Sequence, residues 1–326
     1  MRAQINKEIV RKMKKILMAI LSLALALGIG FAAVGCGAND AIVVCGREAS
    51  SGTREAFDKI VAKDGKTLEK YSEEANPDEN ANAGYVSGAQ YFSGTGLVAN
   101  KVASTAGAIG YISLSSVDDT LKALTVEGVA ATTATVLDGS YKIQRPFVIT
   151  TRTAGLAEGS IAADFLSFLQ SDDAQAVVED EGLVSLTETD DRNGTALGTY
   201  EPKAEAPAQV TDGCVVIRGS TSMEDVITAL VGEYCEVNTW MQESGFSIDL
   251  NGSSEGRSAA KDDTKGNVIG LASSASSSDS ERYCFYIALD AVAVVVNKDN
   301  KLENITLAQL YDIYTGTITK WSELSK

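Results

Sequence analysis

Apolar and polar residues follow two patterns along this chain, and together they predict strands interleaved with helices. Short apolar runs such as Ala41–Val44, and the longer run Ile287–Val296, are typical of buried strands. Segments with apolar residues on one helical face, such as Glu55–Val61 and Ile305–Tyr314, are typical of helices packed on a core. The same patterns predict strands within 108–113, 121–129, 145–150, 214–217, 246–250 and 269–274, and helices at 161–170, 172–181 and around 226–231. This alternation predicts an α/β fold.

Residues 1–35 have the pattern of a secretory signal. Several Lys and Arg residues precede Ile16–Gly35, an apolar and small-residue run that is broken only by Ser22. The run ends in small residues just before Cys36 and is similar to a bacterial lipobox. We therefore expect removal of 1–35 and lipidation of Cys36, followed by a short tether over 36–40. An uncleaved membrane anchor is the alternative, because the run is long enough to span a bilayer.

Two later segments are polar and lack periodicity. Residues 63–82 predict a loop or a frayed helix, and residues 187–212 predict a linker that contains Pro202 and Pro207. The polar bias of the linker makes it a poor candidate for a core segment. It separates two parts of the chain that begin alike, each with a strand, a Gly/Ser/Thr-rich turn and a helix.

The first of these turns, Cys45–Phe57, is a candidate anion site. Free backbone N–H groups and the positive end of a helix dipole meet where such a turn enters a helix. Ser51, Gly52 and Thr53 offer donors and close approach, and Arg47 adds a fixed charge with forked donors. An ordinary capped helix explains the same residues, since Ser and Thr are good N-caps. Turns of similar composition recur at 218–224, 251–256 and 270–274.

Composition narrows the function classes. The chain has 326 residues, a net charge of −16 and no histidine. The acidic charge disfavours a nucleic-acid partner. The absence of histidine removes Ser-His-Asp and Cys-His catalysis and most zinc sites, so we expect no enzyme activity, no metal and no cofactor.

Five cysteines are present without a C-x-x-C pair, which disfavours zinc-ribbon and thioredoxin-like structures. After lipidation of Cys36, the remaining four are Cys45, Cys214, Cys235 and Cys284. They either form two disulfides outside the membrane or stay as buried thiols. Cys45 and Cys214 precede different turns and are not expected to pair.

Taken together, these pieces resemble the phosphate-binding lipoproteins of phosphate ABC transporters, in the two-lobed periplasmic-binding-protein superfamily. The matching segments are 46–54 (GREASSGTR), 108–114 (AIGYISL), 219–222 (GSTS), 252–256 (GSSEG), 270–274 (GLASS), 307–316 (LAQLYDIYTG) and 320–324 (KWSEL). They extend over nearly all of the mature chain. Each is weak alone, and the full set is specific.

The resemblance implies a type II fold with the ligand in a cleft between two lobes, but with the order of the halves exchanged. In the family, the pieces matching 213–326 precede those matching 41–186, so we expect a circular permutation joined by the linker 187–212. The chain would cross between lobes near 145–147 and 289–292. One lobe, here called the split lobe, would comprise 41–145 plus 291–326, and the continuous lobe would comprise 146–290. A monomer is expected, with a swapped dimer as the alternative.

By matched position, the resemblance implies phosphate contacts from both lobes. They are Arg47, Ser51, Gly52 and Thr53 on the split lobe, and Thr221, Ser222, Ser253 and Ser273 on the continuous lobe. Hydroxyls, backbone N–H groups and one guanidinium can satisfy a dehydrated oxyanion.

Three positions depart from the family. Some members have Asp where this chain has Ser273, and many have an acid where it has Ala49, so Glu48 or another carboxylate would orient Arg47. Glu255 replaces a small residue, where it would either favour the helix N-terminus or repel an anion.

The resemblance therefore implies an extracytoplasmic, lipid-anchored solute-binding protein. It would capture inorganic phosphate and deliver it to ABC permease subunits. Within the same class, sulfate, molybdate or tungstate are alternative ligands. A non-transport surface lipoprotein with a degenerate cleft is an alternative from another class.

Overall fold

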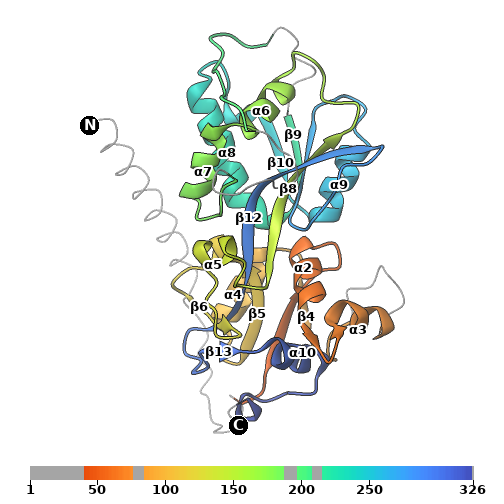
Figure 1. Ribbon diagram of the computed structural model, residues 1–326, viewed down its shortest axis with the longest axis vertical. Coiled ribbons are helices and arrows are strands. Elements are labelled where there is room, and N and C mark those ends of the chain that lie inside the picture. The colour runs from red at the N-terminus through yellow and green to blue at the C-terminus, as the bar shows by residue number, and fades with distance from the viewer. Residues whose placement is uncertain (1–39, 76–83, 187–196, 208–214, 325–326) are drawn as a thin grey trace, which may run out of the picture. The chain divides into compact units, whose positions relative to one another are not determined.

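The computed structural model describes residues 40–75, 84–186, 197–207 and 215–324 (Figure 1). The predicted signal 1–35, the lipidation position Cys36 and Cys214 lie outside these residues. Within the described part of the chain, no helix has the length and apolar character needed to cross a membrane.

The described elements are helices and strands in alternation, as the sequence predicts. The helices are α2 (Gly52–Ile60), α3 (Leu68–Ala75), α4 (Thr95–Ser104), α5 (Thr133–Leu137), α6 (Ile161–Leu169), α7 (Asp172–Asp180), α8 (Glu224–Val237), α9 (Ser253–Lys261) and α10 (Leu307–Thr315). The strands are β1 (Val43–Arg47), β2 (Ala62–Lys63), β3 (Lys66–Thr67), β4 (Gln90–Phe92), β5 (Ala108–Ser113), β6 (Leu121–Ala123), β7 (Thr125–Val126), β8 (Gln144–Arg152), β9 (Val215–Gly219), β10 (Phe246–Asp249), β11 (Val268–Ala272), β12 (Arg282–Asn297) and β13 (Asn304–Ile305).

The main strands form one hydrogen-bonded path in the order β10-β9-β11-β8-β12-β5-β1-β4, with β6 paired to β12. The path is continuous because β12 has 16 residues and pairs with β8 on one edge and with β5 further along. Strands β8 and β12 therefore form an antiparallel ribbon that runs through both halves of the molecule (Figure 1).

Two separate cores lie along this path. One core contains buried residues from α6, α7 and α8 together with β9 and β11. The second core is built around α2, α10 and β5. Among the described residues between 146 and 290, Val184 is the one buried residue that belongs to it. On β5, Ile109 and Tyr111 face this second core, while Ala108 and Ile112 face a smaller cluster under α4. That alternation places α2 and α4 on opposite faces of the strand.

Stacked aromatic side chains fix α2 on the sheet. The rings of Phe57 on α2 and Tyr111 on β5 stack with centroids 4.0 Å apart, and Tyr314 on α10 lies 5.0 Å from Phe57. All three side chains are fully buried. Such aromatic pairs contribute about 0.5–1.5 kcal/mol beyond the buried area. This packing holds the N-terminus of α2, and hence the first anion turn, at the end of β1.

Two expectations about polar segments were wrong in part. Within 63–82, the chain forms the short β2–β3 hairpin and α3. In the predicted linker, Tyr200 belongs to the core, and its hydroxyl donates to Asp164 Oδ2 at 2.7 Å. One aromatic side chain thus docks this segment on the core, with a hydrogen-bond acceptor available inside, while residues 201–206 stay exposed.

Of the two alternatives left open for the cysteines, the structure excludes two disulfides. Cys45 on β1 and Cys235 on α8 carry free thiols. Cys214 lies outside the described residues. Burial raises the pKa of the Cys45 thiol to about 11.

The two ends of the described chain are hydrogen-bonded to each other. Ala41 forms a bridge with Lys320, and the Ile42 N–H donates to Thr319 O at 2.8 Å. The Asp40 carboxylate accepts from Ser322. The beginning and the end therefore lie together next to β1 and α10.

Candidate anion-binding site

All eight residues predicted for the site lie at the ends of strands or the beginnings of helices. Arg47 ends β1, and Ser51, Gly52 and Thr53 open α2. Thr221 and Ser222 form a single 3-10 turn between β9 and α8. Ser253 opens α9, and Ser273 follows β11. The structure brings the three Gly/Ser/Thr turns of the continuous lobe against the Arg47 turn.

Direct hydrogen bonds join the two lobes in this cluster. Arg47 Nη2 donates to Thr221 Oγ1 at 2.9 Å, and the hydroxyls of Thr53 and Ser222 are 2.8 Å apart. Seven of the eight predicted residues are buried; Thr221 is partly exposed. The predicted set is thus one compact group of donors.

Gly52 and Gly219 permit the close approach of the turns. A Cβ at Gly52 would lie 2.4 Å from Ser253 Oγ and 2.8 Å from Ser273 Oγ. Gly219 has φ +137°, and a Cβ there would lie 2.1 Å from the carbonyl oxygen of Leu271. Any side chain at either position would push the strand-end turns apart.

Arg47 is held by several acceptors. Its Nε and Nη2 donate to Glu48 at 3.0 and 2.9 Å, and Nε also donates to Phe92 O at 3.2 Å. Nη1 donates to Thr95 Oγ1 at 3.0 Å. Glu48 therefore orients the arginine, as expected for a chain with Ala49 at the usual acidic position. A guanidinium fixed in this way is pre-organised for an anion.

The Ser51 hydroxyl also acts as a helix cap. It accepts from the Arg54 N–H at 3.4 Å, which is the ordinary role of Ser at this position. Arg54 donates to the Arg47 carbonyl at 3.2 Å and pairs with Asp58. Burial raises the pKa of Asp58 to about 6, although Arg54 opposes the shift.

Sequence reasoning missed four polar residues of the cluster. Thr95 opens α4, and Ser220 donates to Ser273 Oγ at 2.7 Å. Arg145 on β8 donates to Thr53 Oγ1 at 2.7 Å and pairs with Asp290 on β12. The Gly-Thr turn at 94–95 was a usable signal, because it has the composition of the other turns.

A second contact joins the lobes beside the cluster. Glu55 on α2 accepts from Ser274 Oγ at 2.7 Å and lies 3.4 Å from Arg257 on α9. Arg257 also donates to Ser274 Oγ at 3.0 Å. Glu255 lies in the first turn of α9, which is the favourable helix position foreseen for it.

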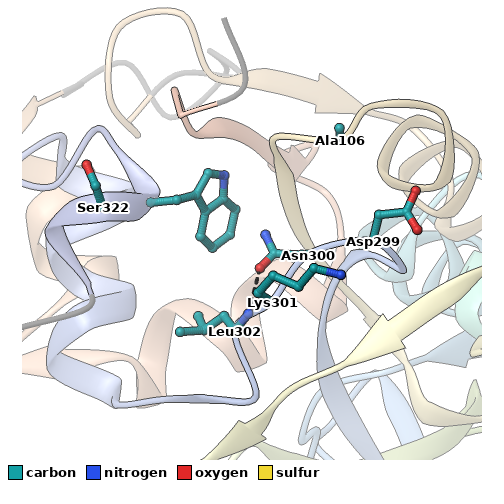
Figure 2. Close-up of a pocket in the computed structure, with 7 residues that line it drawn as sticks. Ala106, Asp299, Asn300, Lys301, Leu302 and Ser322 are labelled. Carbon is teal, nitrogen blue, oxygen red and sulfur yellow. Dashed lines mark hydrogen bonds between the residues drawn. The ribbon is translucent and has the colours of Figure 1, made fainter. Parts of the chain in front are cut away.

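A larger hollow lies away from this cluster. This pocket has a volume of about 480 Å³. It is lined by Ala106, Asp299, Asn300, Lys301, Leu302, Trp321 and Ser322 (Figure 2). None of these residues belongs to the hydroxyl cluster, so the size of a hollow does not identify the anion site here. Among the described residues, no group of three or more Cys, Asp or Glu side chains is arranged to hold a metal ion.

Comparison with known proteins agrees with this fold. A family model described as a PBP superfamily domain matches residues 15–173 and 200–326, so the chain belongs to this superfamily. The phosphate-binding protein PstS 2 of Streptococcus pneumoniae serotype 4 is 34% identical over 321 residues, which cover 94% of this chain and 98% of that protein. The phosphate-binding protein PstS of Bacillus subtilis is 31% identical over 166 residues, covering 48% of this chain and 47% of that one.

A solved structure shows the same likeness in three dimensions. The crystal structure of a phosphate-binding protein of a phosphate ABC transporter from Streptococcus pneumoniae TIGR4 has a TM-score of 0.60 and 32% identity. The match covers 87% of this chain and all of that one. The family resemblance drawn from the motifs is thereby confirmed.

Proposed function

We propose that this chain is an extracytoplasmic solute-binding protein that captures inorganic phosphate and delivers it to an ABC permease. The observation that carries the proposal is the cluster in which Arg47, Thr53, Thr221 and Ser222 meet across two lobes. The relatives described above are phosphate-binding proteins. The role is binding rather than catalysis.

The geometry supports a capture step in which the anion replaces hydrogen bonds that the two lobes make with each other. Thr53 and Ser222 hydrogen-bond each other across the lobes, and so do Arg47 and Thr221. A tetrahedral oxyanion between the lobes would accept these same donors, together with N–H groups at the starts of α2 and α9. The net charge of −16 does not prevent this, because distant surface charges are screened over about 8–10 Å at ordinary salt.

Sulfate is the second candidate ligand, and Ser273 is the observation that favours testing it. A carboxylate at this position would accept the proton of hydrogen phosphate and reject sulfate. The Ser273 hydroxyl can donate or accept, so discrimination rests on how the surrounding serines orient it.

We also propose the exchanged order of the halves and the lipid anchor. The pneumococcal match runs through nearly all of both chains, whereas the Bacillus match stops at about half of each. This difference in match length would arise if this chain had its two halves in the same order as the pneumococcal protein, and in the opposite order to the Bacillus protein. In cells, a Cys36→Ala variant should lose the mass of the lipid and leave the membrane fraction.

Calorimetric titration of residues 37–326, with bound anion removed first, tests the ligand. Phosphate should bind one to one, and Arg47→Ala should lose binding. Arg282→Ala is the matched control, because Arg282 pairs with Asp279 at the far end of β12. Tight sulfate binding would keep the fold and change the substrate. A failure to bind either anion would overturn the proposal.

A further inference from the structure

Arg145 and Asp290 form a buried pair on the ribbon that joins the two lobes. They are register partners on β8 and β12, and their side chains are 1% and 0% exposed. Arg145 Nε and Nη2 donate to Asp290 Oδ2 at 3.2 and 2.9 Å. Asp290 Oδ2 also accepts from Ser113 Oγ at 2.8 Å. The guanidinium is therefore held in place on two of its three nitrogens.

The third nitrogen of Arg145 reaches both lobes. Nη1 donates to Thr53 Oγ1 at 2.7 Å and to the carbonyl oxygen of Ser273 at 3.2 Å. A guanidinium has no acceptor, so Thr53 Oγ1 must accept in this contact. The proton of the Thr53 hydroxyl is thereby turned away from Arg145, and Ser222 Oγ of the other lobe, 2.8 Å away, can accept it.

Arg47 acts on two further hydroxyls in the same way. It donates to Thr95 Oγ1 and to Thr221 Oγ1. Each of these threonine hydroxyls thus has one lone pair taken by an arginine and its own proton turned away from a fixed positive charge, which favours it as a donor to a ligand. Such donors suit unprotonated anion oxygens.

The serine hydroxyls of the cluster accept from neutral N–H and O–H groups in these contacts rather than from a guanidinium. Ser220 accepts from the Ser222 N–H at 3.3 Å and donates to Ser273, and Ser253 accepts from the Ser273 N–H at 3.0 Å. The hydroxyls of Ser253 and Ser273 are 3.2 Å apart, and either can donate to the other. A proton on the ligand can be accommodated on this side of the cluster, because one of these hydroxyls can turn to accept it.

We propose that Arg145, held by Asp290, is a positioning residue that commits Thr53 to donate and so favours the dianion of phosphate over the monoanion. The inference rests on the proposed phosphate binding. Without Arg145, the Thr53 hydroxyl could rotate and accept a ligand proton. The preference between the two protonation states would then change.

The test replaces the pair by apolar residues in an Arg145→Met/Asp290→Leu variant. The net charge is unchanged, and replacing a buried ion pair by apolar side chains of similar size is often neutral or stabilising. Phosphate affinity is measured one pH unit above and one unit below the second pKa of phosphate. The charge of Arg47, which also acts on Arg145, is common to both proteins, and the buried Tyr111 stays neutral over this pH range. The control is Lys63→Met/Asp312→Leu. It removes an ion pair that lies away from the site, and it also leaves the net charge unchanged.

We expect the variant to bind phosphate about tenfold more weakly than the wild type at the higher pH. At the lower pH, the loss of affinity should be much smaller. An equal loss at both pH values would overturn the inference and leave Arg145 a structural role. If the double variant does not fold, Thr53→Val decides, since loss of a committed donor must also weaken the dianion more. A wild-type protein that does not bind phosphate would instead overturn the proposed function.

Discussion

The contact of Glu55 with Arg257 and Ser274 should contribute to closing of the cleft from outside the anion site. Glu55 belongs to α2 and its partners to the other lobe, so the contact exists only when the lobes are together. The Glu55 and Arg257 side chains are 30% and 18% exposed. Burial alone would raise the pKa of Glu55, but hydrogen bonds from Lys59 and Ser274 and the charge of Arg257 lower it overall. The carboxylate therefore stays ionised at neutral pH.

The expected loss in the free energy of closing follows from the interactions that Glu55→Gln weakens. A partly exposed ion pair is worth about 0.2–1 kcal/mol. A hydrogen bond to a charged acceptor exceeds a neutral one by about 1 kcal/mol. A loss of about 1–2 kcal/mol would shift the closing equilibrium about 5–30-fold toward the open form. For a ligand held by both lobes, and an open form that predominates without it, phosphate affinity should fall by a similar factor.

Calorimetry measures the affinity, and small-angle scattering without phosphate measures the separation of the lobes. Lys59→Met is the matched control, because Lys59 contacts Glu55 from the same helix and not across the cleft. We expect less than a twofold effect of Lys59→Met. High salt should reduce the difference between wild type and Glu55→Gln. As the pH falls through the lowered pKa of Glu55, the wild type should come to resemble the variant.

Equal affinities of Glu55→Gln and wild type, with unchanged scattering, would refute this reasoning. So would an equal effect of Lys59→Met, because that residue makes no contact with the other lobe that could explain it. Either result would place the free energy of closing in the hydroxyl cluster and the ribbon.

Three further predictions concern single positions. Gly52→Ala should weaken phosphate binding by about tenfold or more in calorimetry, because its Cβ would lie 2.4 and 2.8 Å from Ser253 and Ser273 hydroxyls; wild-type affinity would contradict the close approach. Asp58→Asn should remove a loss of stability as pH rises from about 4 to 6, since the raised pKa of about 6 means that the folded state holds the proton that the unfolded state releases; thermal unfolding of both proteins across this range is the check. Cys45 should resist thiol reagents until unfolding, because burial raises its pKa to about 11; rapid labelling, mapped by mass spectrometry, would contradict its burial.

Local sequence was enough to predict the turns that carry the donors. Arg47, Thr53, Thr221 and Ser273 each follow a strand in a Gly/Ser/Thr turn, and such turns have a distinctive local composition. The strand ends of a sheet bring them together. The motif resemblance added which turns share one cleft.

The pair of Arg145 and Asp290 had no comparable signal. These residues are 145 positions apart, and their contact depends on the register of β8 against β12. A polar residue within a strand shows no partner in the sequence. Tyr200 was missed for a related reason, because one aromatic residue in a polar segment produces no periodicity.

The continuous ribbon of β8 and β12 determines where the chain ends can be moved by circular permutation. Its register runs from Arg282 opposite Arg152 to Ala291 opposite Gln144, with an irregularity between Tyr286 and Ala288. Both passages between the cores are internal strands, so new chain ends placed in loops outside the ribbon leave them paired. An exchanged order of the halves would therefore preserve the β8–β12 ribbon that connects the two cores. Engineered cyclisation of the neighbouring ends at Asp40 and Ser322 should preserve it as well, which makes the protein a suitable scaffold for inserting reporter domains.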